Sequence, residues 1–460
     1  MLPPTAAVAP FTGCRLRALS LVLLLLLAAC RSRSATHDGG PPADSARPLA
    51  PKSSAAPRCR PIPGASLVLG TAHGKAPVLD DAHEDAEIEL PFSVELGAAH
   101  SAASGFALGG IESRAGANHA FVAWLDASRG LGKSVELGRI FGDVEPPVVT
   151  VQGDRWLVAL ADSDAAGGVL RVLSLAAPFT ADSVVRGAEI TGVRRDASGF
   201  ALAASESGAL LAWTLVEKGA PRLAVAGIEP ATAKLRGAPR LLPVSPLGEP
   251  EAPRLVPRPG GYFLTYIVRG SAHEPRLQAP VQGVETLMEE GPSAIEIVPL
   301  DAAGQPLSAA RGLTPRDARV IAFDLASTPA GGVLLIYRNE PGGKGLDPPD
   351  LQVVLTRADG TVEQRTWEVG DSAGLPSILR DPAPPSHTAW GFISVPGEQG
   401  TRLSVLGEDP LAAPDFLQDQ SFRTGELMGV LKGRLLLAHA RGTQRDLGLL
   451  ECTPGTQKRP

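Results

Sequence analysis

The eight residues ASRGLGKS, from Ala127 to Ser134, have the spacing of a phosphate-binding loop, with Ala127 in place of the first glycine. In such a loop, backbone amides, a lysine and a hydroxyl hold nucleotide phosphates, and a helix must follow to complete the site. The preceding run HAFVAWLD is a predicted strand, but glycines and paired prolines in the following VELGRIFGDVEPPVV exclude a helix. We therefore expect a turn at Asp126, Gly130 and Gly132, and no nucleotide partner.

Two acidic stretches could bind a hard cation. Asp162, Asp164 and Gly167 in DSDAAGG resemble a calcium loop, but Ala166 occupies the position of the third oxygen ligand, and calcium needs six or more oxygens. A hairpin turn is the favoured interpretation. The run DDAHEDAEIE, residues 80–89, is interpreted as a solvated loop rather than a metal site.

The histidines show no zinc-binding spacing such as HExxH. They are His37, His73, His83, His100, His119, His273, His387 and His439. The sequence also lacks a GxSxG elbow and a CxxC pair, so acyl transfer and thiol redox chemistry have no local support. We therefore assign no catalytic, cofactor-binding or metal-ligating residue, and we expect no cofactor. A histidine site assembled from distant segments stays open.

The N-terminal segment indicates secretion. Arg15 and Arg17 precede the apolar run LSLVLLLLLAAC, which is too short to span a bilayer comfortably. Its last four residues, Leu27, Ala28, Ala29 and Cys30, resemble the lipobox of bacterial lipoproteins. The resemblance implies cleavage before Cys30, a signal peptide over residues 1–29, and fatty acyl chains such as palmitate on the new N-terminal cysteine. The alternative is an ordinary signal peptide in which Cys30 is incidental.

Further expectations concern the cell envelope. Arg31 follows the cysteine where an aspartate would retain a lipoprotein in the inner membrane, so the resemblance implies the outer membrane of a Gram-negative bacterium, on either its periplasmic or its surface face. Residues 30–58 are rich in Ser, Pro, Ala and Gly without apolar periodicity. Such a segment cannot bury enough apolar surface to offset its ordering entropy. We expect a disordered stalk.

Composition favours an all-β fold. The chain has 460 residues with 51 glycines and 43 prolines, so turns must be frequent and long helices rare. The formal net charge of -6 is mild and gives no reason to expect a nucleic-acid partner.

One pattern recurs seven times beyond Cys59: an apolar strand, a polar turn and a second apolar strand. Its copies begin SGFALGG, DRWLVAL, SGFALAA, GGYFLTY, GGVLLIY, TAWGFIS and GRLLLAH. Strand-built repeats of this length are typical of propeller blades. We expect a β-propeller over residues 59–453, with seven blades and a range of six to eight, followed by a flexible tail, 454–460. The pattern resembles the divergent β-propeller lipoproteins of Gram-negative bacteria.

The alternative architecture is two β-sandwich domains. The proline-rich segment Pro239–Pro259 would then be their linker, whereas in a propeller it suits a long loop between blades. A propeller must bring its first and last blades together. Cys59 and Cys452 stand at the two ends of the folded region, in an oxidising compartment, so we expect a disulfide between them.

The expected function is binding rather than catalysis. We predict a non-catalytic scaffold, tethered to the membrane by its lipid, that presents a protein- or glycan-binding surface. The alternative is an extracytoplasmic hydrolase, lyase or lactonase with its active site at the propeller axis. Because propellers carry out both kinds of function, the fold does not decide between them. Mutually close charged groups with perturbed pKa values at the axis would favour the enzyme.

Overall fold

The computed structural model describes the strand-forming part of the chain. The described residues are 58–70, 94–102, 104–114, 117–128, 132–142, 144–164, 167–176, 179–193, 199–270, 291–339, 351–367, 376–384, 390–395, 401–412, 425–441 and 444–453. The predicted signal peptide, nearly all of the predicted stalk, and the C-terminal tail lie outside these residues.

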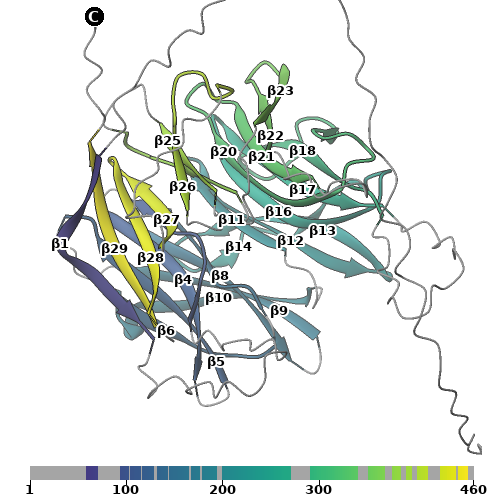
Figure 1. The fold of residues 1–460 in the computed structure, drawn as a ribbon. Helices are drawn as coiled ribbons and strands as arrows, with labels where there is room; N and C mark the ends of the chain where they lie inside the picture. Colours follow the sequence, from purple (N-terminus) through teal and green to yellow (C-terminus); the bar gives the residue numbers. More distant parts are fainter. Residues whose placement is uncertain are drawn as a thin grey trace, which may run out of the picture. The chain divides into compact units, whose positions relative to one another are not determined.

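The described residues form antiparallel meanders in chain order (Figure 1). Meander 1 contains β2 (Val94–Leu96), β3 (His100–Ala102), β4 (Gly105–Arg114), β5 (Ala117–Asp126) and β6 (Gly132–Ile140). Meander 2 contains β7 (Val148–Gln152), β8 (Arg155–Asp164), β9 (Gly167–Ala176) and β10 (Val184–Val193), with the 3₁₀ turn η1 (Ala181–Ser183) before β10. Meander 3 contains β11 (Phe200–Ser205), β12 (Gly208–Glu217), β13 (Ala220–Glu229), β14 (Lys234–Leu235) and β15 (Arg240–Leu241).

The second half of the chain repeats this plan. Meander 4 contains β16 (Glu249–Arg258), β17 (Gly261–Arg269), β18 (Ser293–Asp301) and β19 (Arg311–Gly312). Meander 5 contains β20 (Val320–Ser327), β21 (Val333–Asn339), β22 (Leu351–Thr356) and β23 (Val362–Trp367). Meander 6 contains β24 (Ser377–Arg380), β25 (Gly391–Val395) and β26 (Arg402–Leu406). Meander 7 contains β27 (Gly425–Leu431), β28 (Arg434–Arg441) and β29 (Gln444–Thr453), and β1 (Arg58–Leu69) completes it.

The meanders are arranged as a propeller. Their innermost strands contact one another in the cyclic order β3, β7, β11, β16, β20, β24, β27 and back to β3. An apolar cluster lies between each pair of consecutive meanders, so burial of apolar surface stabilises every junction of the ring. The all-β propeller is therefore confirmed, and the alternative of two β-sandwich domains is wrong.

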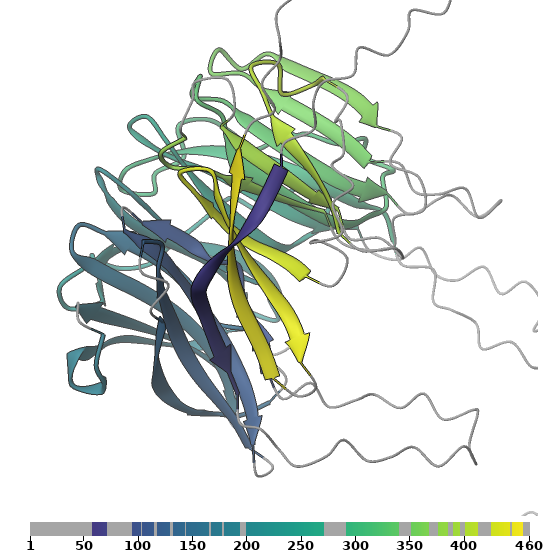
Figure 2. The same ribbon diagram turned by 60° about the vertical axis from the view of Figure 1, so that its left-hand side comes forward.

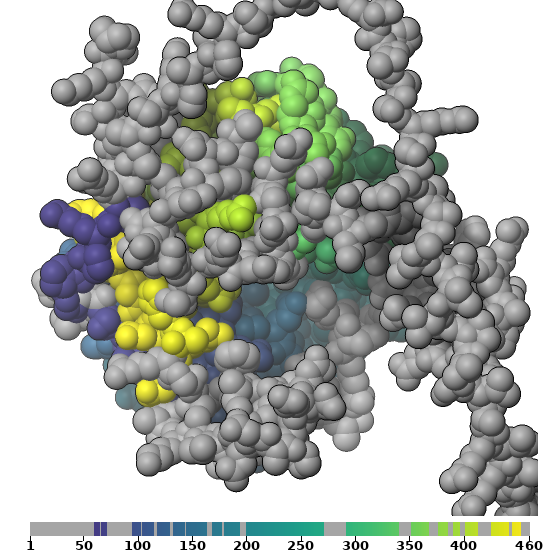
Figure 3. Space-filling view, in the orientation of Figure 1, coloured from purple at the N-terminus to yellow at the C-terminus, as the bar shows by residue number. Residues whose placement is uncertain are grey.

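The ring closes by strand exchange between the two ends of the folded region. β1 pairs antiparallel with β29, with Arg58 opposite Thr453 and Leu69 opposite Arg445. In Figures 2 and 3 the purple β1 lies beside the yellow C-terminal strands. The expectation that the first and last strands meet is confirmed by this pairing.

The sheet count differs from the seven separate blades expected. The described residues form six hydrogen-bonded sheets, five of which contain at least four strands. The difference arises because Val193 of β10 pairs with Leu215 of β12, which joins meanders 2 and 3 into one nine-stranded sheet. Meander 6 has three strands in the described residues.

The proline-rich segment Pro239–Pro259 is neither a linker between sandwiches nor wholly a loop. Its second half is β16, which contains Pro250, Pro253 and Pro257. β16 pairs only with β17 within its sheet, so prolines without an N–H group are compatible with its position at the sheet edge. The prolines led us to expect a linker or a loop here, but proline argues against a strand only when that strand is paired on both sides.

Candidate functional site

Among the charged residues on the innermost strands of meanders 4, 5 and 6, three are considered together: Arg254 on β16, Asp324 on β20 and Arg380 on β24. We call these residues the axial cluster. Because β16, β20 and β24 are consecutive in the ring of innermost strands, the topology brings together residues that are far apart in the sequence.

Asp324 links two of these strands. Its Oδ1 atom accepts a hydrogen bond of 2.8 Å from the N–H of Leu325, and its Oδ2 atom accepts one of 2.7 Å from the N–H of Ile378 on β24. Burial raises the pKa of the Asp324 carboxyl to about 6, although both backbone donors and the charge of Arg254 favour the ionised form. The side chain therefore changes its protonation state close to neutral pH.

One arginine acts on this carboxyl, and a second lies on the next innermost strand. The Nη1 atom of Arg380 donates a hydrogen bond of 2.5 Å to the hydroxyl of Ser327. Partial burial lowers the pKa of Arg380, but a guanidinium stays protonated in proteins at neutral pH. Arg254 lies 5.9 Å from the ring centre of Phe323 and acts electrostatically on Asp324. The cluster thus combines two permanent positive charges with one titratable negative charge.

A β-bulge sets the position of Arg254. The register between β16 and β17 shifts between Glu251 and Arg254, and Ala252 has a φ angle of 46°, in the left-handed region that L-residues rarely occupy. A bulge inserts an extra residue, bends the strand and redirects the following side chains. The backbone is therefore strained immediately before the arginine that acts on Asp324.

His100 occupies the innermost strand β3, on the other side of the ring from β20 in the order of strand contacts. Burial lowers the pKa of its imidazole to about 4. The ring is therefore neutral at neutral pH and has a nitrogen available to accept a proton. The next residue, Ser101, donates a 2.6 Å hydrogen bond to the carbonyl of Val430 and so ties β3 to β27.

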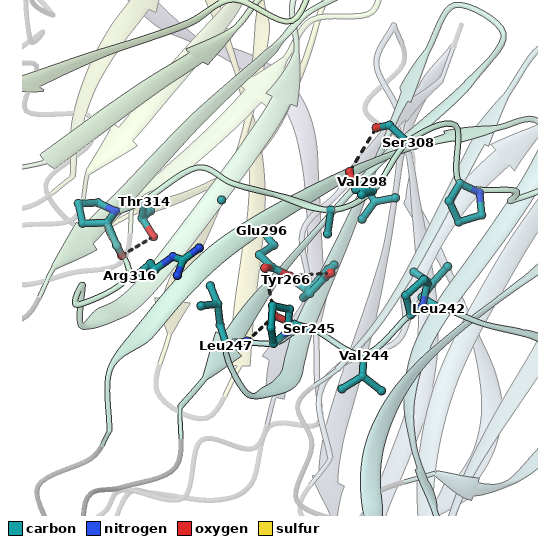
Figure 4. Close-up of a pocket in the computed structure, with 17 residues that line it drawn as sticks. Leu242, Val244, Ser245, Leu247, Tyr266, Glu296, Val298, Ser308, Thr314 and Arg316 are labelled. Atoms are coloured by element: carbon teal, nitrogen blue, oxygen red, sulfur yellow. Dashed lines mark hydrogen bonds between the residues drawn. The ribbon is translucent and has the colours of Figure 1, made fainter.

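A second candidate site is a pocket of about 590 Å³ beside β17, β18 and the segment between β15 and β16 (Figure 4). We call it the lateral pocket. One of its lining residues is Glu296 on β18, a charged residue with a buried side chain. The residues that line it are Leu242, Pro243, Val244, Ser245, Pro246, Leu247, Tyr266, Glu296, Val298, Pro306, Ser308, Ala309, Ala310, Gly312, Thr314, Pro315 and Arg316.

Two hydroxyl groups hold Glu296. Ser245 donates a 3.0 Å hydrogen bond to Oε1, and Tyr266 donates one of 2.9 Å to Oε2. Tyr266 is directly opposite Glu296 in the ladder between β17 and β18, which explains how the two side chains meet. Burial and the neighbouring Glu296 both raise the pKa of Tyr266, so its hydroxyl remains a donor. Figure 4 shows the Glu296 carboxylate held by these partners.

The sequence ASRGLGKS joins two paired strands, and Gly132, predicted to belong to the turn, lies instead in β6 opposite Leu125. β5 ends at Asp126, whose Oδ1 accepts a hydrogen bond of 2.8 Å from the N–H of Ser128. Lys133 and Ser134 belong to β6, which pairs with β5, so a strand follows where a phosphate site needs a helix. Residues 129–131 lie outside the described part of the chain.

The stretch DSDAAGG spans the end of β8 and the start of β9, which pair as the predicted hairpin requires, while residues 165 and 166 lie outside the described part of the chain. Asp164 of β8 pairs with Gly167 of β9. Asp162 is buried, forms an ion pair of 2.5 Å with Arg171 and accepts a hydrogen bond of 2.8 Å from the N–H of Phe141. These contacts give Asp162 a structural role.

Several predicted features fall outside the described residues. These are the acidic run 80–89, the lipobox with Cys30, and the histidines His37, His73, His83, His273 and His387. Of the remaining histidines, His119 lies 2.9 Å from Glu136 through Nδ1, and His439 belongs to β28. Among the described residues, no group of three metal-ligating side chains is close enough to hold an ion, and no helix has the length and apolarity of a membrane span.

The backbone places Cys59 directly opposite Cys452 in the ladder between β1 and β29. Opposite residues of an antiparallel pair have Cα atoms about 4.5–5.5 Å apart, within the range that a disulfide requires. Cys59 is disulfide-bonded in the structure. The side chain of Cys452 lies outside the described residues, so the pairing of these two cysteines stays a prediction.

Comparison with known proteins identifies the fold but not a family. No protein-family model matches the chain, and no characterised protein matches its sequence. A solved structure of a PL25 polysaccharide lyase, an ulvan lyase bound to -[GlcA(1-4)Rha3S]-, is similar with a TM-score of 0.51 and 7% identity, over 76% of this chain and 90% of that one.

Two further solved structures are similar at lower scores. The polysaccharide lyase Uly1 has a TM-score of 0.49 and 12% identity, over 77% of this chain and 89% of its own. The β-propeller domain of the Trilobed protease from Pyrococcus furiosus has a TM-score of 0.44 and 10% identity, over 80% of this chain and 98% of its own. At such identities the similarity concerns architecture alone.

Proposed function

We propose that this protein is a lipid-anchored propeller of the cell envelope that binds an acidic glycan through the axial cluster. The observation that carries the proposal is the positive charge of Arg254 acting on Asp324 of the neighbouring innermost strand, with Arg380 on the next such strand. Guanidinium groups bind carboxylates and sulfates with short, charge-assisted hydrogen bonds, often in pairs. An anionic sugar is therefore the ligand chemistry that this cluster fits best.

The position of the cluster favours a slender ligand. Arg254 and Asp324 are half-buried on innermost strands rather than displayed on an outer strand. An extended sugar chain can reach such recessed groups, whereas the surface of a folded protein cannot. This favours a glycan over a protein partner.

Affinity measurements with polygalacturonate, a polymer of carboxylated sugars, test the proposal, with neutral dextran as the comparison polymer. We expect the full-length protein in detergent to bind polygalacturonate and not dextran. Arg254→Ala and Arg380→Ala should each weaken binding by about tenfold to a hundredfold, the range for a lost charge-assisted hydrogen bond. Arg186→Ala, on the exposed surface of the outer strand β10, is the control and should leave affinity unchanged. Equal binding of the two polymers would contradict the proposal.

Catalysis is a second candidate function, and one specific observation favours it. Asp324, with a pKa near 6, and neutral His100, with a pKa near 4, lie on innermost strands of the ring, and each can exchange a proton with a bound sugar. An enzyme of this kind would cleave the bound glycan by hydrolysis or by elimination.

Incubation with polygalacturonate separates binder from enzyme. An enzyme produces new reducing ends, and elimination also produces an unsaturated sugar that absorbs ultraviolet light. Turnover that disappears in both Asp324→Asn and His100→Gln, with polymer binding retained, would establish the catalytic function. Tight binding without any new reducing ends would support binding and contradict catalysis.

The proposed anchor rests on the lipobox residues Leu27 to Cys30. Several acyl chains on one cysteine give stable attachment to a membrane, whereas a single chain binds only weakly. Cys30→Ser should prevent acylation and release the protein from the outer-membrane fraction. Cys14→Ser, within the predicted signal peptide, is the matched control and should leave both unchanged. Normal processing and membrane retention of the Cys30→Ser variant would contradict the anchor.

We further propose a disulfide between Cys59 and Cys452. The direct opposition of the two residues in the ladder between β1 and β29 supports it. A bond that encloses nearly the whole propeller should stabilise the fold by up to roughly 5 kcal/mol through the entropy of the unfolded chain. Peptide mapping without reduction should find the two cysteines joined. Recovery of both as free thiols from unreduced protein would exclude the bond.

A further inference from the structure

The lateral pocket contains a buried carboxylate, that of Glu296, with no ion pair among the described residues. Glu296 is 4% exposed, and its partners among the described residues are two neutral hydroxyl groups. Within that part of the chain, no lysine or arginine forms an ion pair with it. Because the carboxylate has no direct ion pair there, it can attract a cation that enters the pocket and donates a hydrogen bond to it.

The carboxylate has unused capacity to accept hydrogen bonds. Its two oxygens offer about four acceptor positions, and Ser245 and Tyr266 use one on each oxygen. Because the raised pKa of Tyr266 keeps its hydroxyl protonated, that hydroxyl holds the carboxylate in place, and Glu296 lines the cavity.

The remaining walls suit a compact apolar body. Four prolines line the pocket, and their fixed φ angles limit its collapse when it is empty. Leu247, Val298 and Ala309 contribute apolar surface. A volume of about 590 Å³ lies within the usual range for sites that bind small molecules.

We propose that the lateral pocket binds a small organic ammonium ion, whose nitrogen donates to Glu296 and whose apolar body contacts the proline-rich walls. This site is separate from the axial cluster, and its ligand has the opposite charge. The exposed Arg316 also lines the pocket, and its positive charge disfavours a second cationic group on the ligand. The pocket therefore selects a monoamine over a diamine of similar shape.

Calorimetric titration of the full-length protein with cyclohexylammonium tests this inference, with cyclohexanol as a neutral analogue of similar shape. We expect the amine to bind at least about tenfold more tightly than the alcohol, as one charge-assisted hydrogen bond implies. The diamine trans-1,4-diaminocyclohexane should bind more weakly than cyclohexylammonium. Equal affinities for amine and alcohol would overturn the proposal.

Two variants locate the binding site. Glu296→Gln should abolish the preference for the amine while the alcohol still binds, and Glu206→Gln, in an exposed turn, is the matched control that keeps the preference. Ala310→Trp places a large side chain at an exposed position that lines the pocket, leaves Glu296 unchanged in the sequence, and should eliminate binding of both compounds. If Glu296→Gln fails to fold, Ala310→Trp decides. Unchanged amine binding in Ala310→Trp would overturn the assignment to this pocket.

Discussion

Glu296 and Asp324 are both carboxylates set into β-strands of one propeller, yet their neighbours differ. Glu296 lies on the third strand of meander 4 and is held by hydroxyls from β17 and from the segment before β16. Asp324 lies on the first strand of meander 5, accepts a hydrogen bond from a neighbouring meander and interacts with Arg254 of another. A carboxylate on an innermost strand can thus meet charges from other sheets, whereas one on an outer strand depends on its own sheet and its linkers.

The largest expected difference between Glu296 and Asp324 is the loss in free energy of unfolding when each is replaced. Glu296→Ala leaves the Tyr266 hydroxyl buried without its acceptor, so it should lower the free energy of unfolding by about 2–3 kcal/mol. Asp324→Ala should cost about 1 kcal/mol less than Glu296→Ala, because residue 324 is more exposed than residue 296 and water can reach the two N–H groups that lose their acceptor. Urea denaturation measures both values, and the reverse order would invalidate the contrast between the sites.

A smaller effect concerns pH. Asp324 is ionised at neutral pH and competes with an anionic ligand for Arg254, but it gains a proton as the pH falls through about 6. Affinity for polygalacturonate should therefore rise by about tenfold from pH 7 to pH 5, since one nearby negative charge is removed. In Asp324→Asn the rise should disappear. A parent protein with a flat profile would show that Asp324 does not face the ligand.

The smallest effect provides a baseline for both sites. Lys133 is exposed on the outer strand β6, where no role in binding is expected. Lys133→Ala should change the free energy of unfolding by less than about 0.5 kcal/mol, as is usual for exposed positions. Its affinities for polygalacturonate and cyclohexylammonium should equal those of the parent. A measurable effect on nucleotide binding would contradict the assignment of ASRGLGKS to a hairpin.

The outer hairpins could be predicted from the sequence because their signals are local. All seven repeated pairs are formed by adjacent paired strands, from β4 with β5 to β28 with β29. Several innermost strands gave weaker signals: β2 and β3 have three residues each, β24 has four, and β16 contains three prolines. Alternation is difficult to detect in such short or proline-containing strands.

The candidate sites depend on information that the sequence carries only in part. Glu296 interrupts the apolar run SAIEIVPL at a position that shares a face with Ala294 and Val298, which is a detectable signal of a buried carboxylate. Asp324 gives a similar signal within VIAFDLAS. Their partners could not be predicted, because Arg254 and the N–H of Ile378 come close to Asp324 only when consecutive meanders pack around the ring.

The exchange of β1 into the last sheet also determines how the molecule bears tension. A pull on the chain ahead of Arg58, such as a lipid tether would transmit, enters the propeller through β1, and the ladder with β29 would open one pair at a time from Arg58 towards Leu69. Cys59 and Cys452 form the second pair from that end. With the proposed disulfide in place, peeling stops after a single pair, and the load passes covalently into β29.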